Sequence, residues 1–377
     1  MSVKSEVVVV RADREPMPGV ERPGPHQIYR HPRVEVEVRE LGALQPDAIR
    51  VRMIYAGLCG TDVHLVTANP ETGYILSSAP ALIPPEGRIL GHEGVGEVLA
   101  RGERVSQVKP GDLVTFESIL VCHRCDVCRR GQFNQCRHAR LVGLEEDGIF
   151  GTIVDVHSML AHEVTALAKT EEGLRAAACV EPAGVAYVAC QNTGVGGGDV
   201  VVVFGAGPIG LLAAMLGRLV FGAAEVHVVE PVAARRELAR RWSTRVYDVE
   251  AFFADPPPAV DVLIEASGEM ANVSRLFHRL DANARVALLA RSGKPLSLDA
   301  VDHMITNQIS LIGSRGHLCG AFAKILGLCE RGRLPLHEIV TEVVRGPQAL
   351  CALLRDPDRI LTGGGKILAR LDAGGRS

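Results

Sequence analysis

The sequence has few aromatic residues, almost no net charge and no block of like charge. Aromatic residues make up 4% of its 377 residues, and 41 basic against 44 acidic residues leave a formal net charge of −3. A nucleic-acid-binding tail or a membrane-surface segment would show as a run of like charge. We therefore expect the partner to be a small molecule, with neither a nucleic acid nor a membrane as partner.

The sequence also lacks an export signal. The apolar residues 7–10 are too few for a signal peptide and have no basic flank or cleavage site. Residues 200–217 carry no Asp, Glu, Lys or Arg and reach the lower length limit of a transmembrane helix. Their Val-rich start favours a strand, and their Gly and Pro residues favour a break before a helix, so we reject the membrane interpretation. A cytoplasmic protein is expected.

Disulfide bonds are not expected, because ten cysteines in a chain without an export signal are typical of metal ligands or buried thiols. Five of them stand scattered in apolar surroundings and are interpreted as packing residues: Cys179, Cys190, Cys319, Cys329 and Cys351. The other five belong to the motifs described below.

The length predicts two domains, and the hydrophobic pattern changes along the chain. The first part is β-rich, with strands expected at 33–39, 49–54, 95–99 and 113–116. From about residue 185, strands alternate with helices, and six strands are expected at 200–204, 226–230, 245–249, 260–265, 284–290 and 309–313. This alternation indicates a doubly wound parallel sheet. We expect domains at 1–184 and 185–317, and a return segment at 318–377 that packs back on the first.

A glycine-rich turn follows the first strand of the second domain. Gly205, Gly207, Pro208, Ile209 and Gly210 close that strand and open a helix, which is the context a dinucleotide-binding turn requires. The glycines permit a tight turn, close approach of a pyrophosphate and close helix packing, and the helix N-terminus favours phosphate.

An acidic residue is expected about 20 positions further on, at the end of the second strand. Glu230 stands there, and a carboxylate that binds ribose hydroxyls and repels a 2′-phosphate favours NAD over NADP. Arg235 and Arg236 weaken that preference, since either has the reach for a 2′-phosphate; alternatively they form a solvated helix face.

Four cysteines are clustered: Cys122, Cys125, Cys128 and Cys136. Four thiolates at this spacing are typical of a closed, tetrahedral structural zinc site around 117–140. An iron–sulfur cluster also opens with this spacing, but here the fourth cysteine follows seven residues later and no Pro succeeds it. A nucleic-acid-binding zinc finger is disfavoured because the protein is not basic.

Two further stretches carry reactive side chains: Gly57–His64, which contains Cys59, Thr61, Asp62 and His64, and Gly91–Gly94, which contains His92 and Glu93. Thiolate and imidazole are ligands that zinc prefers. A single cysteine would more often be a small buried apolar residue, and a single histidine would more often be a hydrogen-bonded polar residue.

Together these motifs resemble the medium-chain, zinc-dependent alcohol dehydrogenase family over nearly the whole chain. The resemblance rests on the Cys59–His64 and Gly91–Gly96 stretches, the four cysteines, Glu181-Pro182 and the turn at 205–210. It implies an α/β protein in which a Rossmann domain is inserted into a GroES-like catalytic domain. It also implies two zinc ions and NAD for each chain, and a homodimer or homotetramer.

The resemblance also assigns zinc ligands. Cys59 and His92 match ligands of the catalytic zinc, and Glu181 stands where classical members have a second cysteine. This departure resembles the sorbitol, polyol and sugar dehydrogenase branch, in which the residue matching Glu93 can join the zinc and the one matching Glu181 binds directly or through water. Cys179 is a rival ligand, but the Glu-Pro motif favours Glu181 over it. Which carboxylate, or water, completes the shell stays open.

The resemblance implies a proton path as well. Thr61 matches the hydroxyl that takes the proton of the alcohol, and His64 matches the residue that passes it to solvent. Asp62 matches a carboxylate that orients the ligand His92.

These features predict a zinc-dependent oxidoreductase that transfers hydride between a secondary alcohol of polyol, sugar or cyclitol type and NAD. A threonine-type amino-alcohol dehydrogenase is the alternative within the family. A non-catalytic zinc- or nucleotide-binding protein is the alternative of another class. The long segment 67–88 is expected to shape a substrate entrance, and Arg315 and His317 either bind a phosphate or carboxylate or cap the sheet.

Overall fold

The alternating residues near the start of the chain form a long antiparallel hairpin. In the computed structural model, which describes residues 3–372, β1 (Val3–Arg14) pairs with β2 (Tyr29–Leu41) from Val3↔Leu41 to Arg14↔Tyr29, with a bulge between Arg11 and Asp13. A short strand, β4 (Arg88–Ile89), pairs with the other edge of β1. Residues 7–10, too short for a signal peptide, are the buried centre of this sheet.

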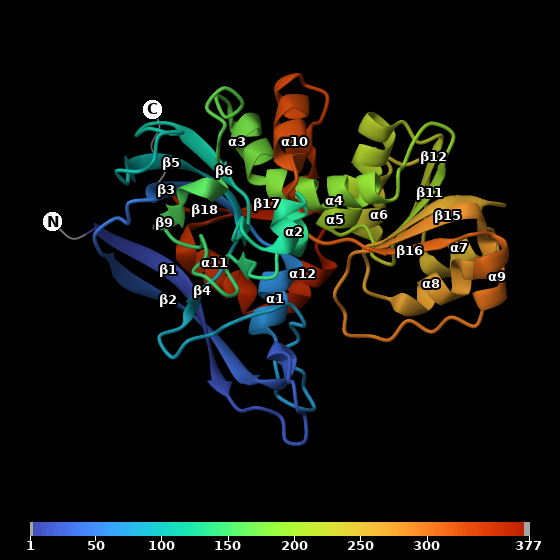
Figure 1. Cartoon of the computed structure of the whole chain (residues 1–377), viewed down its shortest axis with the longest axis horizontal. Coiled ribbons are helices and arrows are strands. Elements are labelled where there is room, and N and C mark those ends of the chain that lie inside the picture. Colours follow the sequence, from blue (N-terminus) through green and yellow to red (C-terminus); the bar gives the residue numbers. More distant parts are fainter. Residues whose placement is uncertain (1–2, 373–377) are drawn as a thin grey trace. The chain divides into compact units, whose positions relative to one another are not determined.

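The chain divides into two units (Figure 1). Of the described residues, unit 1 comprises 3–181, 342–361 and 367–372, and unit 2 comprises 182–341 and 362–366. Residues 318–341 thus belong to unit 2 in this division. They were expected in the return segment, 318–377, which packs on the first domain. Each unit is described by itself.

A second sheet centres on β3 (Ala48–Gly57), the strand that leads to Cys59. Within residues 3–372 its strand order is β10-β6-β5-β3-β18-β17, and β9 also pairs with β3. The other strands are β5 (Glu93–Arg101), β6 (Leu113–Phe116), β9 (Ile153–His157), β10 (Ala161–Glu163), β17 (Val340–Arg345) and β18 (Lys366–Arg370). A buried cluster that includes Ile49, Val51 and Met53 of β3 joins this sheet to β1 and β2.

Short helices and turns connect the strands of this part of the chain. They are α1 (Gly60–Val66), α2 (Asp126–Arg129), α3 (Glu171–Ala178), α11 (Gly346–Leu354) and α12 (Pro357–Thr362), with single 3₁₀ turns η1 (Pro25–Gln27), η2 (Phe133–Gln135) and η3 (Ser158–Leu160). A small hairpin, β7 (Ile119–Leu120) with β8 (Arg140–Leu141), frames the four-cysteine segment.

Unit 2 contains the predicted parallel sheet. Its order is β13-β12-β11-β14-β15-β16, and every pairing is parallel. The strands are β11 (Val200–Phe204), β12 (Glu225–Val229), β13 (Arg245–Tyr247), β14 (Val260–Glu265), β15 (Leu280–Leu288) and β16 (Ser310–Gly313). This is the order of a doubly wound dinucleotide-binding sheet.

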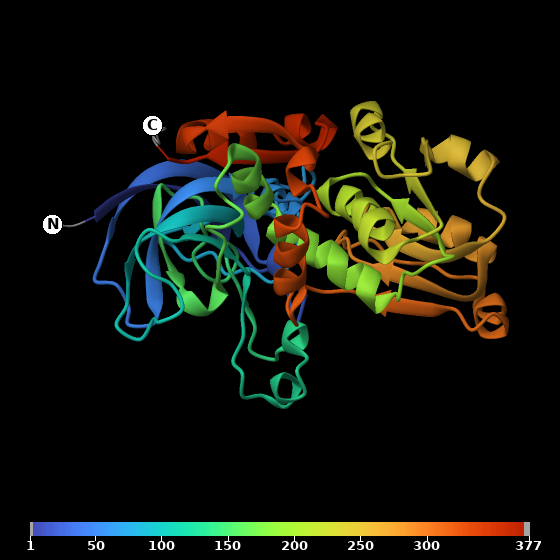
Figure 2. The ribbon, with the colours of Figure 1, turned by 90° about the horizontal axis from the view of Figure 1, so that it is seen from above.

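Helices lie on both faces of this sheet (Figures 1 and 2). The helices that follow α3 and precede β17 are α4 (Val180–Asn192), α5 (Pro208–Leu216), α6 (Ala233–Ala239), α7 (Val249–Ala254), α8 (Met270–Leu276), α9 (Val301–Thr306) and α10 (Ala321–Glu330), with η4 (Gly217–Phe221), η5 (Phe277–Arg279) and η6 (Leu336–Ile339). None of the helices in the described part of the chain combines the length and the hydropathy needed to cross a membrane.

Local capping explains where element boundaries differ from prediction. The strand expected at 245–249 ends at Tyr247, because Asp248 caps α7 by accepting a hydrogen bond from the backbone N–H of Ala251 at 2.9 Å. The helix that opens after the glycine-rich turn is α5, followed by the π-helical turn η4, which ends at the left-handed Gly222 (φ +74°).

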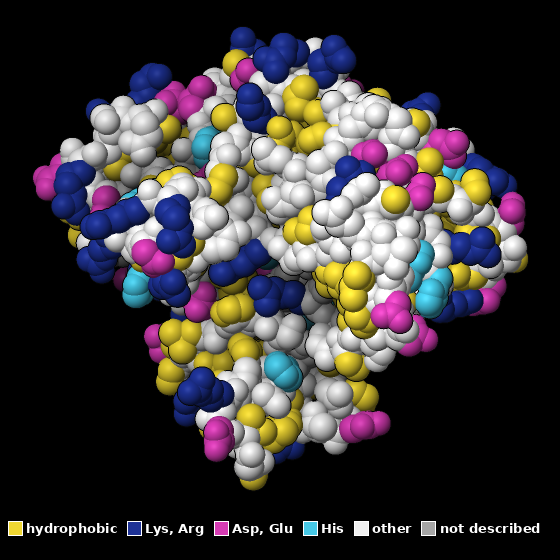
Figure 3. Space-filling view, turned by 45° about the vertical axis from the view of Figure 1, so that its right-hand side comes forward, with side chains coloured by type: hydrophobic (Ala, Val, Ile, Leu, Met, Phe, Trp, Pro, Cys, Tyr) yellow, Lys and Arg dark blue, Asp and Glu magenta, His cyan; other side chains and the backbone are white. Residues whose placement is uncertain are grey.

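The surface carries mixed charge, as the composition predicts. On the face shown in Figure 3, Lys and Arg side chains are interspersed with Asp and Glu.

Candidate functional site

Asp62 fixes the turn that presents Cys59. Cys59 follows β3 and is the N-cap residue of α1, and its backbone N–H donates to Oδ2 of Asp62 at 3.0 Å. This is the reciprocal contact of a capping box, in which an acidic side chain in the first turn satisfies a free N–H group. The sequence Cys59–Asp62 therefore folds into a defined helix start.

The same carboxylate holds the second stretch. Oδ1 of Asp62 accepts a hydrogen bond from the backbone N–H of Gly91 at 3.2 Å and lies 3.8 Å from Nδ1 of His92. Gly91 adopts φ +87°, and a Cβ there would lie 2.1 Å from Cδ1 of Phe150, so this position requires glycine. Asp62, which is fully buried, thus joins the two predicted halves of the site.

Cys59, His92 and Glu93 converge. One ligand atom of each lies within 4.8 Å of the others, and the His92 and Glu93 side chains are buried. Nδ1 of His92 is buried and has no hydrogen-bond partner within residues 3–372. A thiol, an imidazole and a carboxylate at this separation suit zinc. The residues present therefore fit the metal that the sequence predicts.

Electrostatics at His92 reflect this crowding. Burial lowers the pKa of His92, but the negative charges of Asp62, Cys59 and Glu181 outweigh it and raise the pKa well above its ordinary value. The negative groups around His92 therefore favour a cation at this place.

Glu181 lies outside the converging group. No fourth His, Cys, Asp or Glu of residues 3–372 meets the same distance criterion, so Glu181 is near enough to act on His92 through its charge but is not part of the cluster. Instead Oε1 of the buried Glu181, in the first turn of α4, accepts a hydrogen bond from Oγ of Ser118 at 2.7 Å. Ser118 is also buried. Sequence reasoning missed Ser118, because no spacing rule links it to a glutamate 63 residues away.

Thr61 and His64 lie one turn apart on α1. Residues three positions apart share a helix face, so their side chains are neighbours. Oγ1 of Thr61 is 3.7 Å from Sγ of Cys59, which places the hydroxyl beside the metal-binding group. His64 is half-buried, and burial lowers the pKa of its imidazole. A neutral imidazole can accept a proton from a neighbouring hydroxyl.

The four predicted structural cysteines also converge. Ligand atoms of Cys122, Cys125, Cys128 and Cys136 lie within 4.8 Å of one another, and none forms a disulfide. The segment that holds them projects from the rest of unit 1 (Figure 2).

Backbone donors in this segment favour thiolates. The N–H groups of Cys125 and His138 donate to Sγ of Cys122 and Cys136, at 3.4 Å in each case. The backbone N–H groups of Cys128 and Arg137 lower the pKa of Cys125 to about 6. Four sulfur ligands in a closed group fit a structural zinc site and leave no open position for a substrate.

The glycine-rich turn forms a cradle in unit 2. Gly205 adopts φ +90°, and a Cβ there would lie 2.9 Å from Cα of Ser267. A Cβ on Gly210 would lie 1.9 Å from the carbonyl oxygen of Gly205. Gly207 is the N-cap of α5, with Pro208 and Ile209 in its first turn. Bare backbone at a helix N-terminus is the arrangement that admits a pyrophosphate.

Glu230 lies beside this turn. Its Oε2 accepts a hydrogen bond from the backbone N–H of Ala206 at 2.6 Å, and its Oε1 accepts one from Val232 at 2.9 Å. Nη1 of Arg236 donates to the carbonyl oxygens of Glu230 and Pro231, and Nε of Arg235 donates to that of Gly363. Both arginines are thus engaged with backbone oxygens, while the Glu230 carboxylate stays against the turn.

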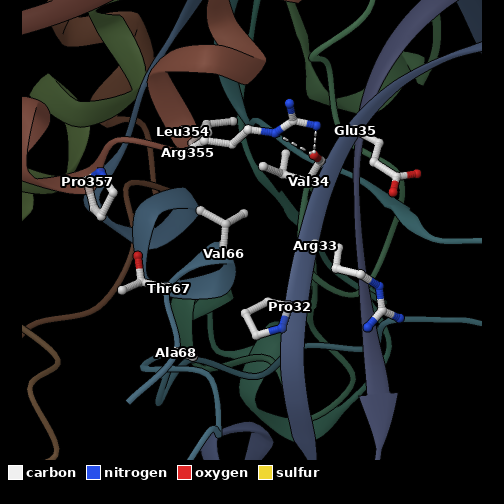
Figure 4. A pocket seen from close by; sticks show the side chains of 10 residues that line it. All are labelled: Pro32, Arg33, Val34, Glu35, Val66, Thr67, Ala68, Leu354, Arg355 and Pro357. Atoms are coloured by element: carbon white, nitrogen blue, oxygen red, sulfur yellow. Dashed lines mark hydrogen bonds between the residues drawn. The ribbon is translucent and has the colours of Figure 1, made fainter. Parts of the chain in front are cut away.

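Segment 67–88, Arg315 and His317, which were also predicted to be functional, are not among the converging residues. A cavity of about 490 Å³ in unit 1 is lined by residues of β2, the end of α1 and the α11–α12 region (Figure 4), and these include none of the predicted metal or catalytic residues. Segment 67–88 contributes Thr67 and Ala68 to it. His317 is buried and packs on Phe322, with ring centroids 5.2 Å apart, whereas Arg315 is half-buried at the end of β16.

Comparisons with known proteins agree with this organisation. Residues 45–168 match the alcohol dehydrogenase GroES-like domain family. The chain is 30% identical to the L-threonine 3-dehydrogenase of Pyrococcus abyssi over 323 residues, which is 83% of this chain and 88% of that protein. It is 30% identical to the scyllo-inosose 3-dehydrogenase of Thermotoga maritima over 344 residues, covering 84% and 85%.

A solved structure shows the same fold. A candidate alcohol dehydrogenase from Thermotoga maritima superposes with a TM-score of 0.87 at 26% identity, covering 97% of this chain and all of the other. The predicted α/β fold, a GroES-like domain with a Rossmann domain, is confirmed. The chain belongs to the medium-chain, zinc-dependent alcohol dehydrogenase family, in its polyol- and sugar-dehydrogenase-like branch, and is an alcohol dehydrogenase.

Proposed function

We propose that this enzyme transfers hydride between a secondary alcohol of polyol, sugar or cyclitol type and NAD. The observation that carries the proposal is the convergence of Cys59, His92 and Glu93 in unit 1, fixed by the buried Asp62. A carboxylate in the ligand group is the feature by which the sequence resembles the polyol branch. One of the relatives is named a scyllo-inosose 3-dehydrogenase, which supports this substrate class.

Two zinc ions are proposed for each chain, one for each converging group. Zinc, when bound at an open site, acts as a Lewis acid that lowers the pKa of a hydroxyl ligand. Cys59, His92 and Glu93 are proposed to hold it, and Ser118 is proposed to keep the Glu181 carboxylate beside the group without entering it. The four cysteines are proposed to brace their segment through the second ion.

The chain's own residues then move the proton. Bound NAD would accept the hydride from the carbinol carbon; as that C–H bond breaks and the C=O bond forms, the hydroxyl proton has to be taken up by the protein. Thr61 is placed to accept that proton beside Cys59, and His64, one turn further along α1, is placed to pass it to solvent. Asp62, whose Oδ1 lies 3.8 Å from Nδ1 of His92, is proposed to orient this imidazole.

NAD is proposed over NADP. The Glu230 carboxylate lies against the phosphate-binding turn, where it would repel a 2′-phosphate. Arg235 and Arg236 are both bonded to backbone oxygens and so are not poised to neutralise that phosphate.

A threonine-type amino-alcohol dehydrogenase is the second candidate. Its support is the 30% identity to an L-threonine 3-dehydrogenase. A homodimer or homotetramer is proposed by the family resemblance, and light scattering after gel filtration tests it.

Substrate profiling tests the function. NADH formation is measured at 340 nm with sorbitol, xylitol, myo-inositol, L-threonine and ethanol. The proposal expects the highest kcat/KM with a polyol or cyclitol. Turnover of L-threonine alone would move the assignment to the second candidate, and turnover of ethanol alone would contradict both.

A further inference from the structure

Two arginines leave neighbouring strands at the carboxyl edge of the unit 2 sheet. Arg291 lies just after β15 and Arg315 just after β16. The register pairs Leu288 with Gly313, and the backbone N–H of Ser314 donates to the carbonyl oxygen of Leu288 at 3.0 Å. Both arginines therefore follow the ends of neighbouring strands at the same edge of the sheet.

Neither guanidinium has an acidic partner. Within residues 3–372, Arg291 and Arg315 make no hydrogen bond and no ion pair. Arg285, on the same strand β15, by contrast lies 3.0 Å from a carboxylate oxygen of Asp199. Glu269, in the neighbouring loop, is paired with Lys294. An ion pair with a carboxylate, which usually neutralises an arginine, is thus missing for both Arg291 and Arg315 within residues 3–372.

The two positive charges act on each other. Although the Arg291 side chain is exposed, enough protein surrounds its guanidinium that burial lowers its pKa, and the positive charge of Arg315 lowers it further. Two like charges that act on each other raise the free energy, and a bound anion would offset this repulsion. The arrangement therefore favours a bound anion.

The loops that carry this pair adjoin the nucleotide turn. A Cβ on Gly268 would lie 3.2 Å from Cβ of Ser292, and a Cβ on Gly205 would lie 2.9 Å from Cα of Ser267. The loops after β11, β14 and β15 are thus in contact. In open α/β sheets, ligands bind outside the carboxyl ends of the strands.

We propose that Arg291 and Arg315 together bind an anionic group, a carboxylate or a phosphate, of the ligand that occupies this edge. The proposal rests on the proposed function, because a dinucleotide and the alcohol that reacts with it are the ligands this edge would meet. A guanidinium presents paired N–H donors that match both anions, which an ammonium group does not. The anion comes either from the dinucleotide or from the substrate.

Calorimetric titration with inorganic phosphate tests the pair. Phosphate is added to the zinc-loaded enzyme, with and without saturating NADH, for the wild type, Arg291→Gln and Arg315→Gln. Arg279→Gln is the matched control, since Arg279 is exposed, unpaired within residues 3–372 and placed just before β15, at the opposite edge. The two test variants should bind phosphate roughly tenfold more weakly, while the control should match the wild type.

The arms with NADH identify the source of the anion. If phosphate still binds to the NADH complex and the variants keep their NADH affinity, the anion belongs to the substrate, and gluconate should displace phosphate more strongly than sorbitol. If NADH abolishes phosphate binding and the variants also bind NADH more weakly, the anion belongs to the dinucleotide. Both results support the pair as an anion site.

The proposal is overturned if both variants equal the wild type in affinity for phosphate and for NADH. That result would not involve turnover, so it is distinguishable from a failure of the proposed dehydrogenase function. Thermal melts of all three variants identify any loss of folding, and Arg291→Lys, which keeps the charge, should bind phosphate more strongly than Arg291→Gln.

Discussion

Replacing Asp62 by Asn separates two backbone contacts of this carboxylate. Its Oδ2 accepts from the N–H of Cys59 at 3.0 Å and its Oδ1 accepts from that of Gly91 at 3.2 Å. An Asn side chain has one acceptor oxygen and directs its NH₂ group at the other donor. One buried N–H group therefore loses its partner, which costs about 1–3 kcal/mol. For a unit of roughly 200 residues, each kcal/mol lowers Tm by about 2–4 °C.

The metal should be affected more than the fold. Asp62 lies 3.8 Å from Nδ1 of His92, and loss of a residue that orients a ligand histidine costs about 10- to 100-fold in metal affinity. Zinc affinity is measured by competition with a fluorescent chelator, alongside a thermal melt. Asp248→Asn is the control. Asp248, in unit 2, also accepts a hydrogen bond from a backbone N–H group, but it is not next to any of the proposed zinc-binding residues. If Asp62→Asn lowers Tm yet binds zinc as tightly as the wild type, the positioning role is refuted.

Three other changes test separate parts of the site. Ser118→Ala removes one hydrogen bond to the Glu181 carboxylate, so the visible absorption of the cobalt-substituted enzyme should change, and Ser118→Thr should restore it; an unchanged spectrum in Ser118→Ala would contradict the role of this hydrogen bond. Glu230→Gln should raise the NADP-to-NAD ratio of kcat/KM about tenfold or more, since a charge that repels the 2′-phosphate is removed, and a constant ratio would show that selectivity lies elsewhere. Burial lowers the pKa of His64 in the folded protein below its value in the unfolded chain. The free energy of unfolding is therefore highest above the unfolded pKa and falls as the pH drops toward the folded pKa. His64→Gln should reduce this loss of stability at low pH in urea titrations, and a pH profile identical to that of the wild type would contradict the role of His64.

Much of the nucleotide domain follows from the sequence because its causes are local. The turn at Gly205–Gly210 is dictated by sterics, since a Cβ on Gly210 would collide with a carbonyl oxygen five residues away. Strands β11 and β14 occupy the residues predicted for them, because continuous apolar runs mark strands buried on both faces. The end of β13 was less predictable, because Asp248 caps the next helix.

The complete set of zinc ligands could not be predicted from the sequence. Cys59 and His92 carry recognisable motifs, but the choice between Glu93 and Glu181 depends on tertiary placement. Glu93 follows His92 directly and lies within the converging group, whereas Glu181 is bonded to Ser118, a residue with no motif. The unpaired state of Arg291 is equally invisible in sequence, because it depends on which acids other residues have already engaged.

Zinc stoichiometry of single-ligand variants tests the central claim most directly. Elemental analysis should give two zinc ions per chain for the wild type, since two separate groups of ligands converge. Cys59→Ala should retain one ion and lose NADH formation, while Cys190→Ala, which changes a buried cysteine outside both groups, should keep both ions. Two zinc ions in Cys59→Ala, or none beyond the four-cysteine site in the wild type, would contradict the catalytic metal centre.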